Sequence, residues 1–122
     1  MNCQINSLYL CVRDMDRAVM FYEDFFERKA KERDRIYSVF DVEGFRLGLF
    51  AFEKMGEEHS FGSNCLPSVS VDSLDTLKRK IEKLDLCFPL TRIKNNWVAE
   101  FVDSEGNHVE VTAPVSVNSA EG

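Results

Sequence analysis

The sequence is short of the features that would place the protein in a membrane or on a nucleic acid. No apolar run approaches the roughly 18 residues that a membrane-spanning helix needs. Lys and Arg number 15 against 21 Asp and Glu, which gives a net charge of −6 and no surplus of positive charge for phosphates. We therefore expect neither a membrane nor a nucleic acid as a partner.

Pro-rich, Gly-rich and low-complexity tracts are also missing, which excludes extended disorder. Hydrophobic residues make up 44% of the chain and charged residues 30%, a composition typical of a globular protein. At 122 residues the chain fits one domain with a substantial core, whereas each half alone would be marginally stable. Only the tail, residues 115–122, has a composition that predicts disorder.

The sequence lacks both a secretory signal and paired cysteines. Residues 1–4 are polar, and the apolar run after them is too short for a signal peptide. The four cysteines, Cys3, Cys11, Cys65 and Cys87, do not have the spacing of a metal motif. Because stable disulfides need an oxidising compartment, we expect a cytoplasmic protein with reduced thiols.

What the sequence does contain is an internal repeat. Residues 12–16, VRDMD, correspond to residues 71–75, VDSLD, and in both places a strand pattern precedes and a helical pattern follows. Asp14 and Ser73 stand where the N-caps of the two helices belong. The apolar stripes of the helices match position by position: Met15, Ala18, Tyr22 and Phe25 in the first, Leu74, Leu77, Ile81 and Leu84 in the second.

Alternating patterns predict further strands in each half. In the first half a strand precedes the helix, and two strands after it are joined by a turn in which Gly44 favours a positive φ. We expect an α+β fold of two βαβββ repeats: a first unit over residues 4–53, a linker over 54–64, a second unit over 65–114 and the tail. The predicted strands cover residues 6–12, 36–40, 45–52, 66–71, 90–94, 97–102 and 108–112.

Two segments resemble the vicinal oxygen chelate superfamily, which includes glyoxalase I, extradiol dioxygenases and the fosfomycin- and bleomycin-resistance proteins. They are residues 8–22, LYLCVRDMDRAVMFY, and residues 101–111, FVDSEGNHVEV. With the repeat they extend over nearly the whole chain. The resemblance implies two βαβββ units that form a curved, open mixed sheet around a cleft, often within a homodimer.

In the metal-dependent members of that family, four side chains, usually two His and two Glu, converge on a divalent ion. The resemblance places these positions at Ser7, Gly48, Leu66 and Glu110. Only Glu110 can bind a metal. His108 shares its face by strand parity, whereas Glu53 lies on the opposite face from Gly48. Because a catalytic metal usually has three protein ligands, we expect no metal and no cofactor.

Strand parity also predicts which side chains line the cleft, since the opposite parity is almost wholly aliphatic and belongs against the helices. Parity does not decide which face of residues 97–102 lines the cleft, and we favour the face of Trp97. The predicted wall consists of Ser7, Tyr9, Cys11, Gly48, Phe50, Leu66, Ser68, Ser70, Trp97, His108 and Glu110.

These observations favour a metal-free protein that sequesters a small molecule, as the resemblance to bleomycin-resistance members implies. The negative charge and Glu110 favour a cationic ligand. One alternative is a glyoxalase-like lyase or isomerase, with a degenerate metal site on Glu110, His108 and Ser7 or with His108 or Glu110 as general base. Another is a degenerate copy kept for protein–protein contact, with a cleft too closed for a ligand. A separate interpretation of Glu110 is that it only accepts a hydrogen bond from a Ser or Tyr.

Overall fold

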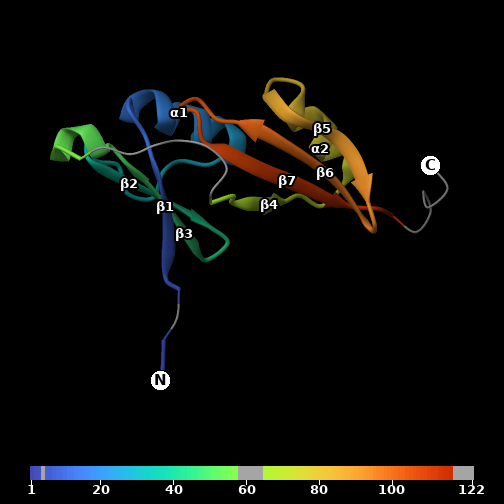
Figure 1. Cartoon of the computed structure of the whole chain (residues 1–122), viewed down its shortest axis with the longest axis horizontal. Coiled ribbons are helices and arrows are strands. Elements are labelled where there is room, and N and C mark those ends of the chain that lie inside the picture. The colour runs from blue at the N-terminus through green and yellow to red at the C-terminus, as the bar shows by residue number, and fades with distance from the viewer. Residues whose placement is uncertain (4, 58–64, 117–122) are drawn as a thin grey trace. The chain divides into compact units, whose positions relative to one another are not determined.

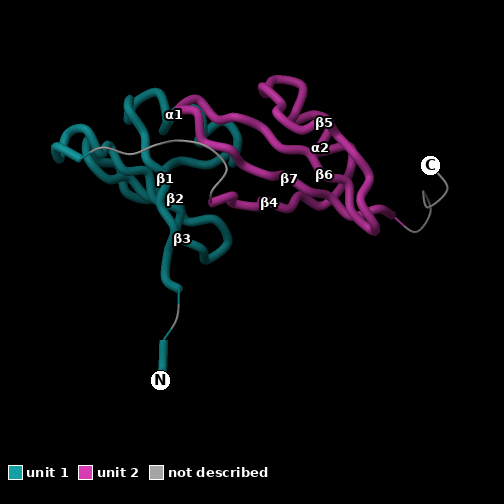
Figure 2. The backbone as a smooth tube through the Cα atoms, viewed as in Figure 1, with its two compact units in different colours: residues 1–61 teal, residues 62–122 magenta. Residues whose placement is uncertain are grey.

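The computed structural model describes residues 1–3, 5–57 and 65–116 and divides into two compact units, Met1–Phe61 and Gly62–Gly122 (Figures 1 and 2). Each unit has its own sheet and its own α-helix. None of the helices in the described ranges has the length and apolar character that crossing a membrane requires.

The first unit is built on a sheet of three strands. The strands lie in the order β1-β3-β2, with β1 parallel and β2 antiparallel to β3. Before β2, Glu32 forms an isolated bridge with Val39, where the repeat predicts a further strand. The elements are β1 (Ser7–Cys11), α1 (Met15–Phe26), β2 (Tyr37–Val42), β3 (Phe45–Phe50) and the 3-10 helix η1 (Phe52–Met55).

The second unit contains the complete strand, helix and three-strand succession that the repeat predicts. Its strands lie in the order β4-β7-β6-β5; β4 is parallel to β7 and the other pairs are antiparallel. The predicted α+β class is confirmed. The elements are β4 (Ser68–Ser70), α2 (Leu74–Ile81), β5 (Asp85–Ile93), β6 (Asn96–Val102) and β7 (His108–Pro114).

Both predicted helix N-caps are confirmed. Asp14 is extended, and its carboxylate accepts a hydrogen bond of 3.0 Å from the Arg17 N–H. Ser73 is extended as well, and its hydroxyl accepts one of 3.2 Å from the Thr76 N–H. These bonds satisfy N–H groups that have no partner inside the helix. The first helix ends at Phe26, because Glu27 adopts the left-handed conformation.

The turn between β2 and β3 also has the predicted geometry. Glu43 and Gly44 both have positive φ, 51° and 90°, which suits a hairpin turn that follows the twist of its strands. The Gly44 N–H donates a hydrogen bond of 2.8 Å to the Asp41 carboxylate. That bond lowers the pKa of Asp41, with help from Lys31 and Arg28 nearby.

Each helix covers one face of its own sheet. In the first unit, the alternating aliphatic side chains of β1 and β3 pack against α1, as predicted. They belong to a core that includes Leu10, Val12, Ala18, Tyr22, Phe40, Leu47 and Leu49. In the second unit Leu77 of α2 is fully buried, as are Ala99, Phe101, Val109, Val111 and Ala113 of β6 and β7. Leu74 and Ile81 are only half-buried, and Leu84 lies beyond the end of α2.

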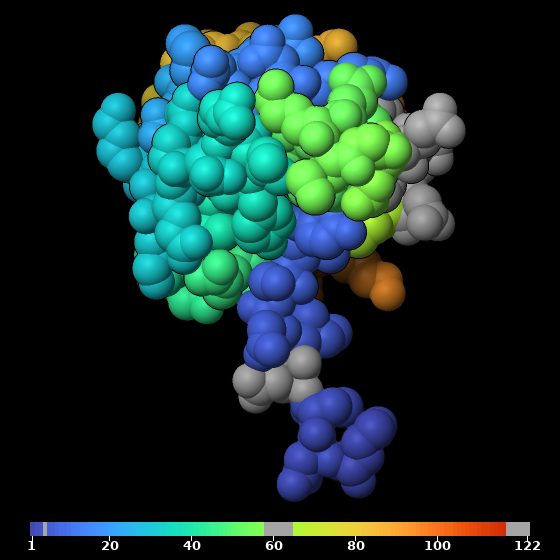
Figure 3. Space-filling view, turned by 90° about the vertical axis from the view of Figure 1, so that its left-hand side faces the viewer, coloured from blue at the N-terminus to red at the C-terminus, as the bar shows by residue number. Residues whose placement is uncertain are grey.

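Residues 1–3 and 5–6 project from the body of the first unit (Figure 3), so Met1 and Ile5 are exposed. The first two residues of the predicted linker, 54 and 55, belong to η1. The rest of that linker from residue 58 on, and residues 117–122 of the predicted tail, lie outside the described residues.

Candidate functional site

The first unit presents aromatic side chains on the face of its sheet away from α1, which we call the helix-free face. Strand pairing sets Tyr9 opposite Gly48 and Cys11 opposite Phe50. The Tyr9 ring meets the Phe50 ring edge-on, with 5.5 Å between centroids, and meets the Tyr37 ring in the same manner at 6.2 Å. The structure therefore brings Tyr9, Gly48 and Phe50 together and adds Tyr37, which the sequence analysis missed.

Tyr37 lies directly over Gly48. A Cβ atom at Gly48 would be 2.1 Å from the Tyr37 hydroxyl oxygen and 2.5 Å from the ring carbon that bears it. Any side chain at position 48 would therefore displace the ring. The signal for Tyr37 was present in the sequence, because strand alternation in β2 puts Tyr37 on the face opposite Phe40, which belongs to the core.

The helix-free face of the second unit is polar. Ser68 pairs with Glu110 across β4 and β7, and its hydroxyl donates a hydrogen bond of 2.5 Å to Glu110 Oε1. The expected hydrogen bond from a serine to Glu110 is thus present. Ser70 is exposed beside them and pairs with Thr112. Leu66 precedes β4 and is 37% exposed.

The expectation that Trp97 shares this face is wrong. Trp97 pairs with Ala113, and Ala99 with Val111, so Trp97 lies on the face that α2 covers. Glu100 pairs with Glu110 and therefore shares its face. Alternation within residues 97–102 shows which side chains share a face but not which face contains Glu110. Only the pairing of β6 with β7 identifies that face.

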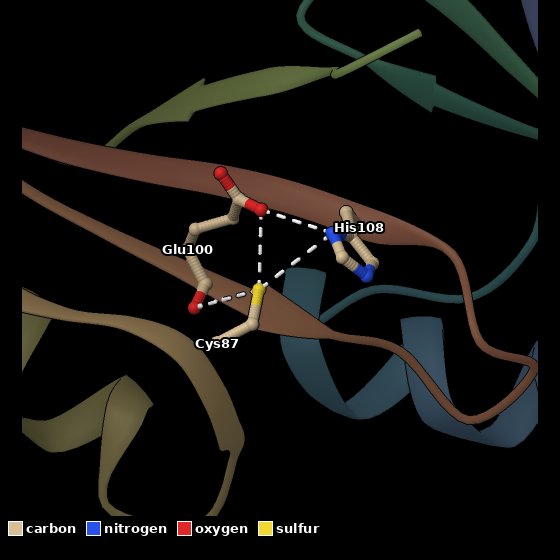
Figure 4. A group of neighbouring side chains, drawn as sticks. All are labelled: Cys87, Glu100 and His108. Carbon is tan, nitrogen blue, oxygen red and sulfur yellow. Dashed lines mark hydrogen bonds and ion pairs between the residues drawn. The ribbon is translucent and has the colours of Figure 1, made fainter. Parts of the chain in front are cut away.

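A cluster of three side chains forms a second feature of this face (Figure 4). The nearest carboxylate oxygen of Glu100 lies 3.0 Å from His108 Nδ1 and 3.1 Å from Cys87 Sγ. The distance from Cys87 Sγ to His108 Nδ1 is 3.7 Å. The Glu100 and His108 side chains are 21% and 27% exposed, and Cys87 is exposed.

A bulge in β5 brings Cys87 into the cluster. Leu86 pairs with Phe101, whereas Phe88 pairs with Glu100, so β5 has one residue more than β6 at this point. Such a bulge re-aims a side chain, and the extra residue here is Cys87. Its place depends on a change of register that no alternation pattern reveals, so the sequence analysis assigned Cys87 and Glu100 no role.

The cluster is not arranged as a nucleophilic triad. Partial burial and the adjacent Glu100 carboxylate raise the pKa of the Cys87 thiol, so it is protonated at neutral pH. In a triad the histidine uses one ring nitrogen for the nucleophile and the other for the acid. Here both partners approach Nδ1 of His108.

The pKa of Cys11, in the first unit, is also raised by burial and by Glu57, and none of the four cysteines forms a disulfide.

Comparison with known proteins agrees with this architecture. The family model described as Glyoxalase/Bleomycin resistance protein/Dioxygenase superfamily matches residues 4–111. The chain belongs to this superfamily. No match was found among curated proteins.

Several solved structures share the fold at low identity. A glyoxalase/bleomycin resistance protein from Albidiferax ferrireducens T118 is 12% identical, with a TM-score of 0.76 over 89% of this chain and 97% of that one. A lactoylglutathione lyase from Agrobacterium tumefaciens is 20% identical, with a TM-score of 0.74 over 93% and 95%. A protein of unknown function from Agrobacterium tumefaciens str. C58 is 21% identical, with a TM-score of 0.75 over the same shares. At these identities the likeness concerns the fold.

The residues at the superfamily's metal positions do not fit a metal ion. In the first unit Gly48 has no donor and is covered by Tyr37, and Ser7 offers only a hydroxyl. In the second, Leu66 has no donor and Glu110 is hydrogen-bonded to Ser68. One carboxylate falls short of the three protein ligands that a catalytic ion usually has.

We predict that Gly48→Ala costs about 1–3 kcal/mol of unfolding free energy, because the new methyl group and the Tyr37 ring compete for one space. In a Tyr37→Ala background the same substitution should be neutral or stabilise by about 0.5–1 kcal/mol, since alanine suits a strand better than glycine does. Urea unfolding of the four proteins measures both costs. Equal costs in the two backgrounds would show that the ring does not lie over Gly48.

We also predict that Glu100→Gln speeds the alkylation of Cys87 by iodoacetamide at pH 8 in the presence of a chelator. The substitution removes the carboxylate that raises the pKa of Cys87, so more thiolate forms. Mass spectrometry of timed digests gives the rate, and Cys3 in the same digests is the internal control. A Cys87 rate that stays unchanged or falls would contradict the assigned contact.

Proposed function

We propose that the protein binds a small molecule on the helix-free faces of its sheets, without a metal ion at the position used by metal-dependent relatives. The observation that carries the proposal is the Tyr37 ring over Gly48. Where the resemblance implies a metal ligand, this chain has an aromatic ring instead. The surface is therefore suited to ring contacts and not to chelation.

The aromatic set supports contact with a flat or apolar part of the ligand. Tyr9 is 50% exposed although it is a large ring, and it meets both Tyr37 and Phe50 edge-on. Edge-on contacts leave a ring face open to a further partner. Ligand pockets are mostly apolar walls with a few placed polar groups, and each tyrosine here also offers a hydroxyl.

The polar face of the second unit supports the binding of a cationic group. A carboxylate has several acceptor positions, so Glu110 can accept a hydrogen bond from Ser68 and still bind a cation. The chain's net charge of −6 favours the approach of such a ligand. The serine hydroxyls of β4 add donors and acceptors beside it.

Sequestration is favoured over metal-dependent catalysis because Gly48 and Leu66 have no donor atoms where the resemblance implies metal ligands. In line with the dimers of the superfamily, we also propose that two copies associate, which sedimentation would establish.

We predict that a thermal-shift screen of cationic antibiotics and other flat cations finds a ligand. At a hundred times its Kd such a ligand stabilises the folded protein by about 2.7 kcal/mol. For a ligand on the helix-free face of the first unit, Tyr9→Ala should weaken binding about 3–10-fold through the lost ring contact. For a ligand on the helix-free face of the second unit, Glu110→Gln should weaken binding about 10–100-fold through the lost charged hydrogen bond.

Matched controls are available for both substitutions. Phe45→Ala removes an aromatic ring of similar exposure whose strand parity puts it on the α1 side of β3, and Glu82→Gln removes an exposed acid at the end of α2. Both should leave the Kd unchanged. The proposal fails if no cation binds, if all four variants behave alike, or if the protein isomerises substrate with a metal that Glu110→Gln removes.

A further inference from the structure

We propose that Cys87, Glu100 and His108 form a site for a zinc-type divalent transition-metal ion, separate from the superfamily's metal position. The proposal goes beyond the small-molecule function and does not depend on it. Within the described ranges, these residues are the one group of three or more His, Cys, Asp or Glu side chains whose donor atoms all converge.

The spacing of the three donor atoms suits a tetrahedral ion. The separations are 3.0 Å from nitrogen to oxygen, 3.1 Å from sulfur to oxygen and 3.7 Å from sulfur to nitrogen. With bonds of about 2.0–2.1 Å to nitrogen and oxygen and about 2.3 Å to sulfur, a tetrahedral Zn²⁺ holds its ligand atoms roughly 3.3–3.6 Å apart. Each observed separation is within about 0.5 Å of that range, so side-chain rotation alone would admit the ion.

The backbone holds the donors in place before any ion binds. They come from three adjacent strands, β5, β6 and β7, and they point toward one another in Figure 4. Glu100 pairs with Glu110, and Val102 pairs with His108, so Glu100 and His108 are diagonal neighbours on one face. The β5 bulge supplies Cys87 from the third strand. Sites built on strands keep their geometry better than sites on loops.

The donor set selects the class of ion. Sulfur and imidazole nitrogen favour Zn²⁺ and similar ions over Mg²⁺ and Ca²⁺, which prefer oxygen ligands. One thiolate and one carboxylate balance the double positive charge, so the occupied site is neutral. Because the cluster is partly exposed, a water molecule can take the fourth position.

Binding replaces the proton of the Cys87 thiol with the ion and releases that proton to solvent, with no change of oxidation state. Because binding releases this proton, the affinity for the ion should increase as the pH increases from 6 to 8. Glu110 lies on the same face of β7, but its carboxylate is not among the convergent donors.

The test is titration of the metal-free full chain with Co²⁺ and with Zn²⁺ against a chromophoric competitor. We expect one equivalent of either ion and a near-ultraviolet charge-transfer absorption from the thiolate–Co²⁺ bond. Cys87→Ser should remove this absorption and weaken Zn²⁺ binding at least tenfold, and Glu100→Gln should weaken it as well. Cys65→Ser, at another exposed cysteine of the second unit, and Glu110→Gln should leave both measurements unchanged.

A second readout avoids dependence on the folding of any variant. In the unmodified protein, one equivalent of Zn²⁺ should slow the alkylation of Cys87 at least tenfold and leave Cys65 unaffected. The proposal is overturned if the protein takes up no ion, if Cys87→Ser keeps the Co²⁺ absorption, or if Zn²⁺ fails to protect Cys87. Loss of Zn²⁺ binding in Glu110→Gln alone would place the ion at the superfamily's position and would also contradict the proposed function.

Discussion

Each sheet has one face packed under a helix, and this restricts the chemistry of each unit to the opposite face. The restriction follows from the period of two along a strand, because alternate side chains point to opposite sides. In the first unit, the aliphatic side chains that alternate along β1 and β3 are buried against α1. In the second unit, the corresponding side chains of β6 and β7 are buried together with Leu77 of α2. Apart from Trp97, the candidate residues on the strands lie on the opposite face.

One substitution and one retained residue, relative to the metal-binding pattern that the resemblance implies, give the two helix-free faces their character. Glycine at position 48 leaves a space that the Tyr37 ring fills, and Phe50 and Tyr9 extend the aromatic surface from β2 across β3 and β1. Glu110, kept where the resemblance implies a ligand, accepts a hydrogen bond from Ser68. Under the proposed function, the same fold presents a binding surface without the usual chelating side chains, in agreement with the general rule that function lies in sites and not in folds.

The sequence was sufficient for those parts of the structure that depend on local patterns. Asp14 and Ser73 are N-caps because short polar side chains before an apolar stripe satisfy the first helical N–H groups. The assignment of Ser7, Tyr9 and Cys11 to one side of β1 rested on alternation in the same manner. These features need no knowledge of distant residues.

Features that depend on the pairing between strands could not be predicted from the sequence. Trp97 was assigned to the wrong face because only its pairing with Ala113 relates β6 to β7. Cys87 was overlooked because a bulge, which leaves no trace in the alternation, turns its side chain toward Glu100. Tyr37 could have been found by parity, but its position over Gly48 depends on the packing of one side chain across a neighbouring strand.

The most direct test of the account is anomalous diffraction at the zinc absorption edge from crystals grown with Zn²⁺. We expect one strong peak within bonding distance of Cys87, Glu100 and His108, no peak at the Glu110 carboxylate, and density for the Tyr37 ring over Gly48. A zinc peak bonded to Glu110, with the Tyr37 ring displaced from Gly48, would contradict the account.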